Sequence, residues 1–218
     1  MDNTNHFKLK KKSPIVDPRY VTNYNRSEEE LESFLLFAVS VAGKTAKQIS
    51  KALNHFLNGE EWKCDISSSP FFTTPFALIR YMYAENILEQ HIRQSRLGQH
   101  NKLKRAFTEI SFSEIDLNVC SVSELEQIHG IGKKTSRFFI LHTRPNVRIA
   151  CIDTHIKKWL SELGYKSKKY ETLEAAFLDE ADKRCRNYAE LDLELWNYYS
   201  DRSGLDNKTT NKEIEYVL

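Results

Sequence analysis

The stretch LEQIHGIGKKTSRFFILHTRPNVRIACIDTHIKKWL, residues 125–160, decides the fold of this chain. Apolar residues recur at helix-like spacing up to a Gly-x-Gly turn, at Leu125, Ile128 and Ile131. A second apolar segment follows the turn. Gly130 and Gly132 are poor helix formers, and glycine suits a backbone with positive φ or one that must lie close to another group. The pattern therefore predicts a helix, a tight hairpin and a second helix.

Two lysines, Lys133 and Lys134, come directly after the turn. A hairpin of this kind exposes several backbone N–H groups at the start of its second helix, and such groups bind anions. With the lysines beside them, the natural anion is a phosphodiester. The same residues also fit an ordinary corner between two helices with a solvated lysine pair.

The apolar run Arg148–Ile152 leads to Asp153, which precedes another amphipathic segment. Aspartate is a favoured N-cap, so we expect Asp153 to cap a helix that begins at Thr154. The cap needs only one carboxylate oxygen. The short link from Phe139 could bring the other oxygen towards Lys134 in a cleft.

Two segments, HGIGKKTSRFFIL and IACIDTHIKKWL, together resemble the helix-hairpin-helix, Gly/Pro-Asp signature of the base-excision DNA glycosylases. That superfamily includes endonuclease III and the 8-oxoguanine DNA glycosylases. The resemblance covers roughly Ser121 to Leu163, with the lysine two residues past the second glycine and the aspartate about 19 residues later. One departure is His129, where the family usually has proline; it leaves the turn less rigid but removes no catalytic group.

The resemblance implies an all-α, two-lobed fold with the active site in the cleft between the lobes. One lobe would be a helical bundle of residues 28–142 that ends in the hairpin. The other would be a composite lobe of residues 1–27 and 143–218. Lys134 and Asp153 would then face each other across the cleft.

The resemblance also implies the chemistry of a bifunctional DNA glycosylase and AP lyase. Such enzymes extrude a damaged nucleotide from the duplex before they act on it. The Asp153 carboxylate would stabilise the positive charge that builds on the sugar. The deprotonated Lys134 amine would attack C1′, form a Schiff base and allow β-elimination. If Lys134 contacts only phosphate, the enzyme would instead be monofunctional.

Further site residues follow from the same resemblance. Backbone groups of the hairpin would contact DNA phosphates, from Gly130, Ile131, Gly132, Lys133, Lys134 and Thr135. His155 would lie at the DNA backbone, although a core or capping role fits it nearly as well. A monovalent cation would bind main-chain carbonyls, those of Glu126, Ile128 and Ile131.

The substrate base is indicated only by the C-terminal stretch LDLELWNYY, residues 191–199. It is similar to the ending of the smaller, archaeal-type 8-oxoguanine glycosylases, and there Trp196 would stack near the base pocket. Trp196 equally fits a core anchor. We therefore expect 8-oxoguanine as the substrate, with the oxidised pyrimidines of endonuclease III as the alternative.

Composition sets the remaining expectations for this 218-residue chain of net charge +2. Four cysteines are scattered at positions 64, 120, 151 and 185. Without a CxxC or Cys/His cluster, we expect no cofactor, no iron–sulfur cluster and no side-chain metal site. We expect an intracellular monomer that binds damaged duplex DNA and no membrane. A non-catalytic DNA-binding module and a helical adaptor remain alternatives.

Basic residues gather in two further places, residues 7–12 and the segment from Arg93 to Arg105. Net charge alone is too small to indicate a polyanion partner, so such clustering carries the argument. Either segment could lie along a phosphate backbone. A solvated surface fits both segments as well.

Overall fold

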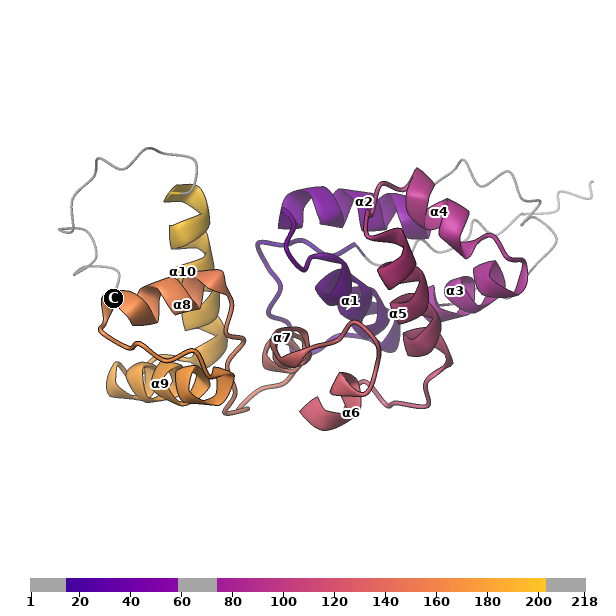
Figure 1. Cartoon of the computed structure of the whole chain (residues 1–218). Helices are drawn as coiled ribbons and strands as arrows, with labels where there is room; N and C mark the ends of the chain where they lie inside the picture. Colours follow the sequence, from indigo (N-terminus) through magenta and orange to yellow (C-terminus); the bar gives the residue numbers. More distant parts are fainter. Residues whose placement is uncertain (1–14, 59–73, 203–218) are drawn as a thin grey trace, which may run out of the picture. The chain divides into compact units, whose positions relative to one another are not determined.

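The computed structural model describes residues 15–58 and 74–202, and over these ranges the chain is helical with no strand (Figure 1). The predicted all-α class is confirmed. In these described ranges, no helix has the length and apolar character to cross a membrane. The basic residues 7–12 and Cys64 lie outside the described residues.

The chain divides into two compact units, an N-terminal unit up to Val147 and a C-terminal unit from Arg148. The N-terminal unit contains α1 (Glu28–Ser40), α2 (Ala46–Asn58), α3 (Pro75–Ala84), α4 (Leu88–Gln94), α5 (His100–Phe112), α6 (Val122–Glu126) and α7 (Lys133–Thr143). The C-terminal unit contains α8 (Thr154–Glu162), α9 (Tyr170–Lys183) and α10 (Tyr188–Arg202).

Helix α1 is the centre of the N-terminal unit. Ser27 caps it in a capping box with Glu30, and every residue from Leu31 to Ser40 is buried. It packs against α2, α3, α5 and α7 (Figure 1). The Phe34 ring lies 5.5 Å from that of Phe138 and 5.9 Å from that of Phe139, centroid to centroid. These aromatic contacts anchor α7, the second helix of the hairpin, to the centre of the unit.

Residues 15–27 group with the N-terminal unit, whereas we expected them in a composite lobe with the C-terminal part of the chain. Their backbone is tied to the end of α7: the His142 carbonyl accepts from the Asn23 N–H (3.0 Å) and from the Arg26 guanidinium (2.8 Å). Thr22 Oγ1 also lies 2.8 Å from His142 Nδ1. These bonds explain why residues 15–27 belong to the N-terminal unit. The sequence could not predict this, because it gives no sign of where an irregular segment docks.

The C-terminal unit has its own hydrophobic core between three helices. The Trp159 indole of α8 is fully buried and meets Phe177 of α9 edge to face, with 5.8 Å between ring centroids. Leu191, Leu195 and Tyr199 complete this core from α10. The segment before α8 therefore ends on a helix that is firmly packed within this unit.

Candidate nucleic-acid interface

The predicted hairpin is present between α6 and α7. Helix α6 begins with a capping box, in which the Ser121 N–H donates to the Glu124 carboxylate (2.7 Å) and the Glu124 N–H to Ser121 Oγ (3.2 Å). Gly130 has φ of +86°, and a Cβ there would lie 3.4 Å from Ala106 Cβ. Gly130 thus meets the first condition expected of a required glycine, because its φ is positive; a Cβ there would be within van der Waals contact of α5.

Gly132 differs from Gly130. Its backbone is extended, with φ of −104° and ψ of −179°. A Cβ at this position would meet no heavy atom of the described residues within 4 Å. Neither local strain nor a close neighbour within these parts of the chain explains this glycine, contrary to the expectation for both. The space beside the Gly132 backbone is open to an approaching group.

The N terminus of α7 is arranged to attract negative charge. Gly132 is its N-cap, and no side chain of the described residues makes the cap bond. The Gly132 carbonyl accepts from the N–H groups of Thr135 (2.9 Å) and Ser136 (3.0 Å), the first bonds of the helix. The first turn carries Lys133 and Lys134 and no acidic residue. Lysines add to the partial positive charge of a helix N terminus, so an anion is stabilised there.

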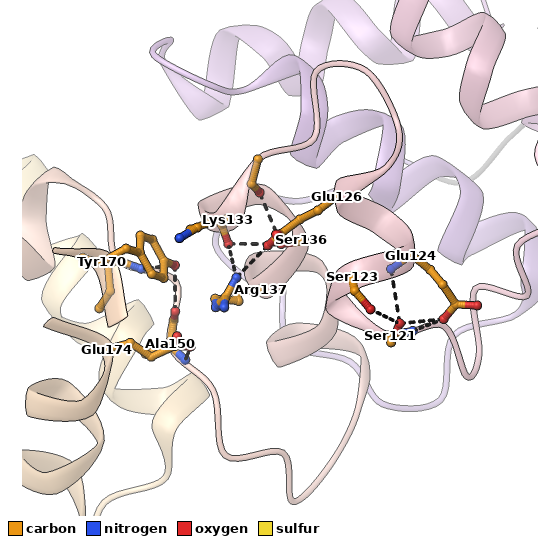
Figure 2. A network of polar contacts seen from close by, with 12 residues as sticks. Ser121, Ser123, Glu124, Glu126, Lys133, Ser136, Arg137, Ala150, Tyr170 and Glu174 are labelled. Carbon is orange, nitrogen blue, oxygen red and sulfur yellow. Dashed lines mark hydrogen bonds and ion pairs between the residues drawn. The ribbon is translucent and has the colours of Figure 1, made fainter. Parts of the chain in front are cut away.

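Glu126, the last residue of α6, fixes the hairpin to α7 (Figure 2). Its Oε1 accepts from Ser136 Oγ (2.9 Å) and from the guanidinium of Arg137 (2.8 Å). The Arg137 side chain is only 14% exposed and also donates to the Lys133 carbonyl (3.3 Å). A mostly buried ion pair with these added bonds holds the two helices at a fixed angle around the turn.

His129 has a role that the proline of the family pattern could not fill. Its backbone N–H donates to Glu109 of α5 at 2.6 Å, and proline has no N–H to donate. Arg105, 2.7 Å from the same carboxylate, and then the His129 N–H hold the pKa of Glu109 below its usual value. In this chain a hydrogen bond to α5 restrains the turn, whereas in the family pattern a proline ring restrains it.

The backbone around the turn bears on two predicted contacts. The Ile128 carbonyl, one of the predicted cation ligands with those of Glu126 and Ile131, accepts the Ile131 N–H at 3.1 Å. That cation site stays a prediction. Thr135 is buried and its N–H is bonded within α7 to the Gly132 carbonyl, so that N–H is already used; the predicted contact of Thr135 with DNA stays a prediction. Across the described residues, no cluster of three or more His, Cys, Asp or Glu side chains could hold a metal ion.

Lys134 is half-buried and lies along its own helix. Its ammonium sits 4.5 Å from the centroid of the Phe138 ring, one turn further along α7, in a cation–π contact. Because Phe138 packs on Phe34 of α1, the lysine rests on a fixed aromatic surface. Its side chain therefore begins at the helix N terminus that attracts anions, with its conformation restrained.

Asp153 caps α8, as predicted. Its Oδ1 accepts both cap bonds, from the N–H groups of His155 (2.8 Å) and Ile156 (2.9 Å). Both bonds use the same oxygen, so the orientation of the whole carboxylate is set by the start of the helix.

The extended residues before Asp153 are held by side chains that the sequence did not single out (Figure 2). The Tyr170 hydroxyl accepts the Ile152 N–H (3.0 Å) and donates to the Ala150 carbonyl (2.9 Å). The Glu174 carboxylate accepts the Ala150 N–H (3.0 Å). These bonds satisfy backbone N–H and C=O groups that a neighbouring strand would otherwise bond. They also fix the position of the backbone just before Asp153.

Two further predicted residues belong to the C-terminal unit. The His155 ring stacks on Tyr199 of α10, with 6.1 Å between centroids and 12° between planes. This contact gives His155 a packing role. Trp196 is half-buried and lies outside the hydrophobic core of the unit, where Trp159 is the central aromatic residue. The core-anchor interpretation of Trp196 is therefore not supported.

The structure thus gathers the predicted residues in two sets. Gly130 to Lys134 lie on one turn of the N-terminal unit, and Asp153 and His155 lie at the start of α8 in the C-terminal unit. No protein-family model matches the chain, and no solved structure matches it significantly.

Proposed function

We propose that this chain is a bifunctional DNA glycosylase and AP lyase of the helix-hairpin-helix superfamily, with Lys134 as nucleophile and Asp153 as the stabilising carboxylate. It removes a damaged base from duplex DNA and nicks the strand by β-elimination. 8-Oxoguanine is the first candidate substrate, and oxidised pyrimidines are the second.

The start of α7 carries most of the argument. It lacks a side-chain cap among the described residues, has open space at Gly132 and presents two lysines in its first turn. A phosphodiester fits this charge and geometry, and hairpin amides would contact it without reading base sequence. The resemblance then assigns the second lysine, Lys134, to chemistry beyond binding.

Asp153 supports the same proposal through its fixed orientation. Cleavage of an N-glycosidic bond builds positive charge at C1′, and a preoriented carboxylate lowers the energy of that state. The cap bonds and the Tyr170 contacts hold the carboxylate without rearrangement. A preoriented charge stabilises a transition state better than one that must reorganise.

In the proposed reaction, the Lys134 nitrogen attacks C1′ and the glycosidic electron pair leaves with the base, which takes up a proton. The resulting aminal opens to a Schiff base between lysine and the sugar. Loss of a C2′ proton then expels the 3′ phosphate by β-elimination. Water hydrolyses the Schiff base and restores the amine, so the step needs no oxidant or cofactor.

One observation favours a second candidate, a DNA-binding module without catalysis. Asp153 has a complete structural role as the cap of α8, and this role alone explains an aspartate at the position. Such a module would use the hairpin for phosphate binding and would leave every lesion intact.

A lesion panel tests the proposal. The protein is incubated with duplexes that carry a single 8-oxoguanine, thymine glycol or abasic site, and the products are resolved with and without alkali. A bifunctional enzyme nicks a lesion strand without alkali. Nicking of the 8-oxoguanine or thymine glycol strand that appears only after alkali, and only with protein, would indicate a monofunctional glycosylase. Salt-dependent binding with every strand intact would favour the non-catalytic module.

A further inference from the structure

The basic side chains between Arg93 and Arg105 differ in whether they form ion pairs. Three of its side chains pair with carboxylates: Arg93 with Glu89 (2.8 Å), Lys104 with Glu89 (3.2 Å) and Arg105 with Glu109 (2.7 Å). Lys102 and Arg96 make no ion pair with any described residue. Of these two, Lys102 lies at the hairpin, beside Gly130.

Lys102 packs directly on the turn. A Cβ on Gly130 would lie 3.4 Å from Lys102 Cε and 3.8 Å from its Cγ. The aliphatic part of the side chain thus covers the glycine, and the ammonium, one bond beyond Cε, lies at the edge of the hairpin. The aliphatic part of Lys102 therefore packs on the turn while its charged end extends past it.

A second cation, Lys44, lies at residues 97–98, just before the start of α5, the helix that carries Lys102. Its Nζ donates to the carbonyl of Leu97 and would lie 3.4 Å from a Cβ on Gly98, so it is fixed at the loop between α4 and α5. Burial lowers the pKa of Lys44, and the ammonium of Lys102 lowers it further. No carboxylate in the described ranges pairs with either lysine. An ammonium has three donors, and Lys44 uses one on a described acceptor.

Two neighbouring cations without an acidic partner repel each other, and a bound anion relieves that repulsion. We propose that Lys102 and Lys44 form a second phosphodiester contact beside the hairpin, so that the N-terminal unit holds the DNA backbone at two points. The inference rests on the proposed function, because it assumes that the hairpin binds duplex DNA. The contact positions the backbone and carries no sequence preference.

The salt dependence of binding to an undamaged duplex tests this contact. Each neutralised phosphate contributes about 0.9 to the slope of log affinity against log salt concentration. Lys102→Gln is expected to weaken binding several-fold and to lower the slope by about one. Lys104→Gln is the matched control, because it removes the same charge from α5 at a residue paired with Glu89. We expect it to leave the slope unchanged.

Lys44 needs two variants because it also tethers a loop. Lys44→Gln is expected to lower the slope, and Lys44→Arg to restore it, since arginine keeps the charge and the donors. Thermal melting of each variant shows that the fold is retained.

A variant in the hairpin, Lys133→Gln, separates the proposed second contact from the proposed hairpin site. If it weakens binding while Lys102→Gln behaves like Lys104→Gln, the second contact is wrong and the hairpin site stands. If the wild-type chain shows no salt-dependent binding, both fail.

Discussion

Helices α7 and α8 begin in opposite ways. Helix α7 begins at Gly132, with no side-chain cap in the described parts of the chain and two lysines in its first turn. Helix α8 begins at Asp153, whose own carboxylate accepts the first free N–H groups. A helix start without its own acceptor offers its N–H groups to an external anion, whereas one with a built-in carboxylate presents that carboxylate. The start of α7 is thus suited to bind a phosphate, and the start of α8 is suited to stabilise a positive charge.

The largest effect is expected from removing the charge at α8 while keeping its cap. Asparagine caps helices as well as aspartate does, so Asp153→Asn should leave the melting temperature nearly unchanged. Base release should fall by about 10²–10³-fold, because the electrostatic stabilisation at C1′ is lost. Single-turnover kinetics with a lesion duplex measures it.

Asp116→Asn is the control for this substitution, because the Asp116 carboxylate also accepts a nearby backbone N–H, that of Asn118 (2.9 Å), at an exposed turn. It should leave base release unchanged. A rate for Asp153→Asn equal to that of the control would leave Asp153 with a structural role only.

The two glycines of the hairpin allow the same substitution to be compared at two positions. Gly130→Ala should lower the free energy of unfolding of the N-terminal unit by about 1–2 kcal/mol, because its φ of +86° is strained for alanine. At Gly132 the loss of a good N-cap and the lower entropy of the unfolded chain oppose each other, so stability should change by less than about 1 kcal/mol.

DNA affinity should follow a different order. Gly132→Ala should weaken binding although it barely affects stability, because its Cβ projects into the open space where a phosphate would approach. Urea denaturation and duplex titration measure the two quantities. If Gly132→Ala binds DNA as well as the wild type does, the phosphate does not approach the backbone at that point.

A smaller effect is expected from Tyr170, which positions the segment before Asp153. Tyr170→Phe removes the hydroxyl bonds to Ala150 and Ile152 and should destabilise the C-terminal unit by about 1–3 kcal/mol. Base release should slow at saturating DNA, with little change in duplex affinity. Tyr188→Phe is the control, because that hydroxyl bonds the exposed Asp182 (2.6 Å). Equal rates for both variants would show that the segment needs no hydroxyl to orient Asp153.

The smallest expected effect is a difference between the two units in the pH at which each loses stability. Burial lowers the pKa of His91 in α4 to about 4, from an ordinary value of 6.5. The unfolded chain therefore takes up this proton first, and the N-terminal unit should lose stability as pH falls from 6.5 towards 4.

In the C-terminal unit, hydrogen bonds from Lys183 and Arg184 lower the pKa of Glu180 to about 2, from 4.5. The stabilising contribution of Glu180 is complete above pH 4.5 and is lost only as pH falls towards 2. Hydrogen exchange followed by peptide mass spectrometry at pH 6.5, 5 and 4 should show loss of protection in the N-terminal unit first. Loss of protection in both units over the same pH range would contradict this order.

The sequence predicted the parts of the site that depend on local rules. The cap at Asp153 and the glycine at 130 each follow from residue type and short spacing, and the structure confirms them. The docking of residues 15–27, the Tyr170 bonds and the Lys102–Gly130 contact join residues far apart in the chain. No local pattern encodes such pairings, because they arise from how the helices pack.

The expectation for Gly132 failed for a related reason. A glycine in a turn usually signals positive φ, but here the neighbouring Gly130 supplies it and Gly132 is extended. Spacing alone could not show which of the two glycines the fold requires. The difference matters for function, because the glycine that the fold does not require is the one beside the open space.

The most direct measurement for the proposed chemistry is covalent trapping with borohydride on a lesion duplex. Borohydride reduces a Schiff base between the enzyme and the sugar to a stable complex that is visible on a denaturing gel. The wild-type chain and Lys133→Gln should be trapped, and Lys134→Gln should not, because only the second lysine is the proposed nucleophile. Trapping of Lys134→Gln as efficient as that of the wild type would contradict the assignment of this amine.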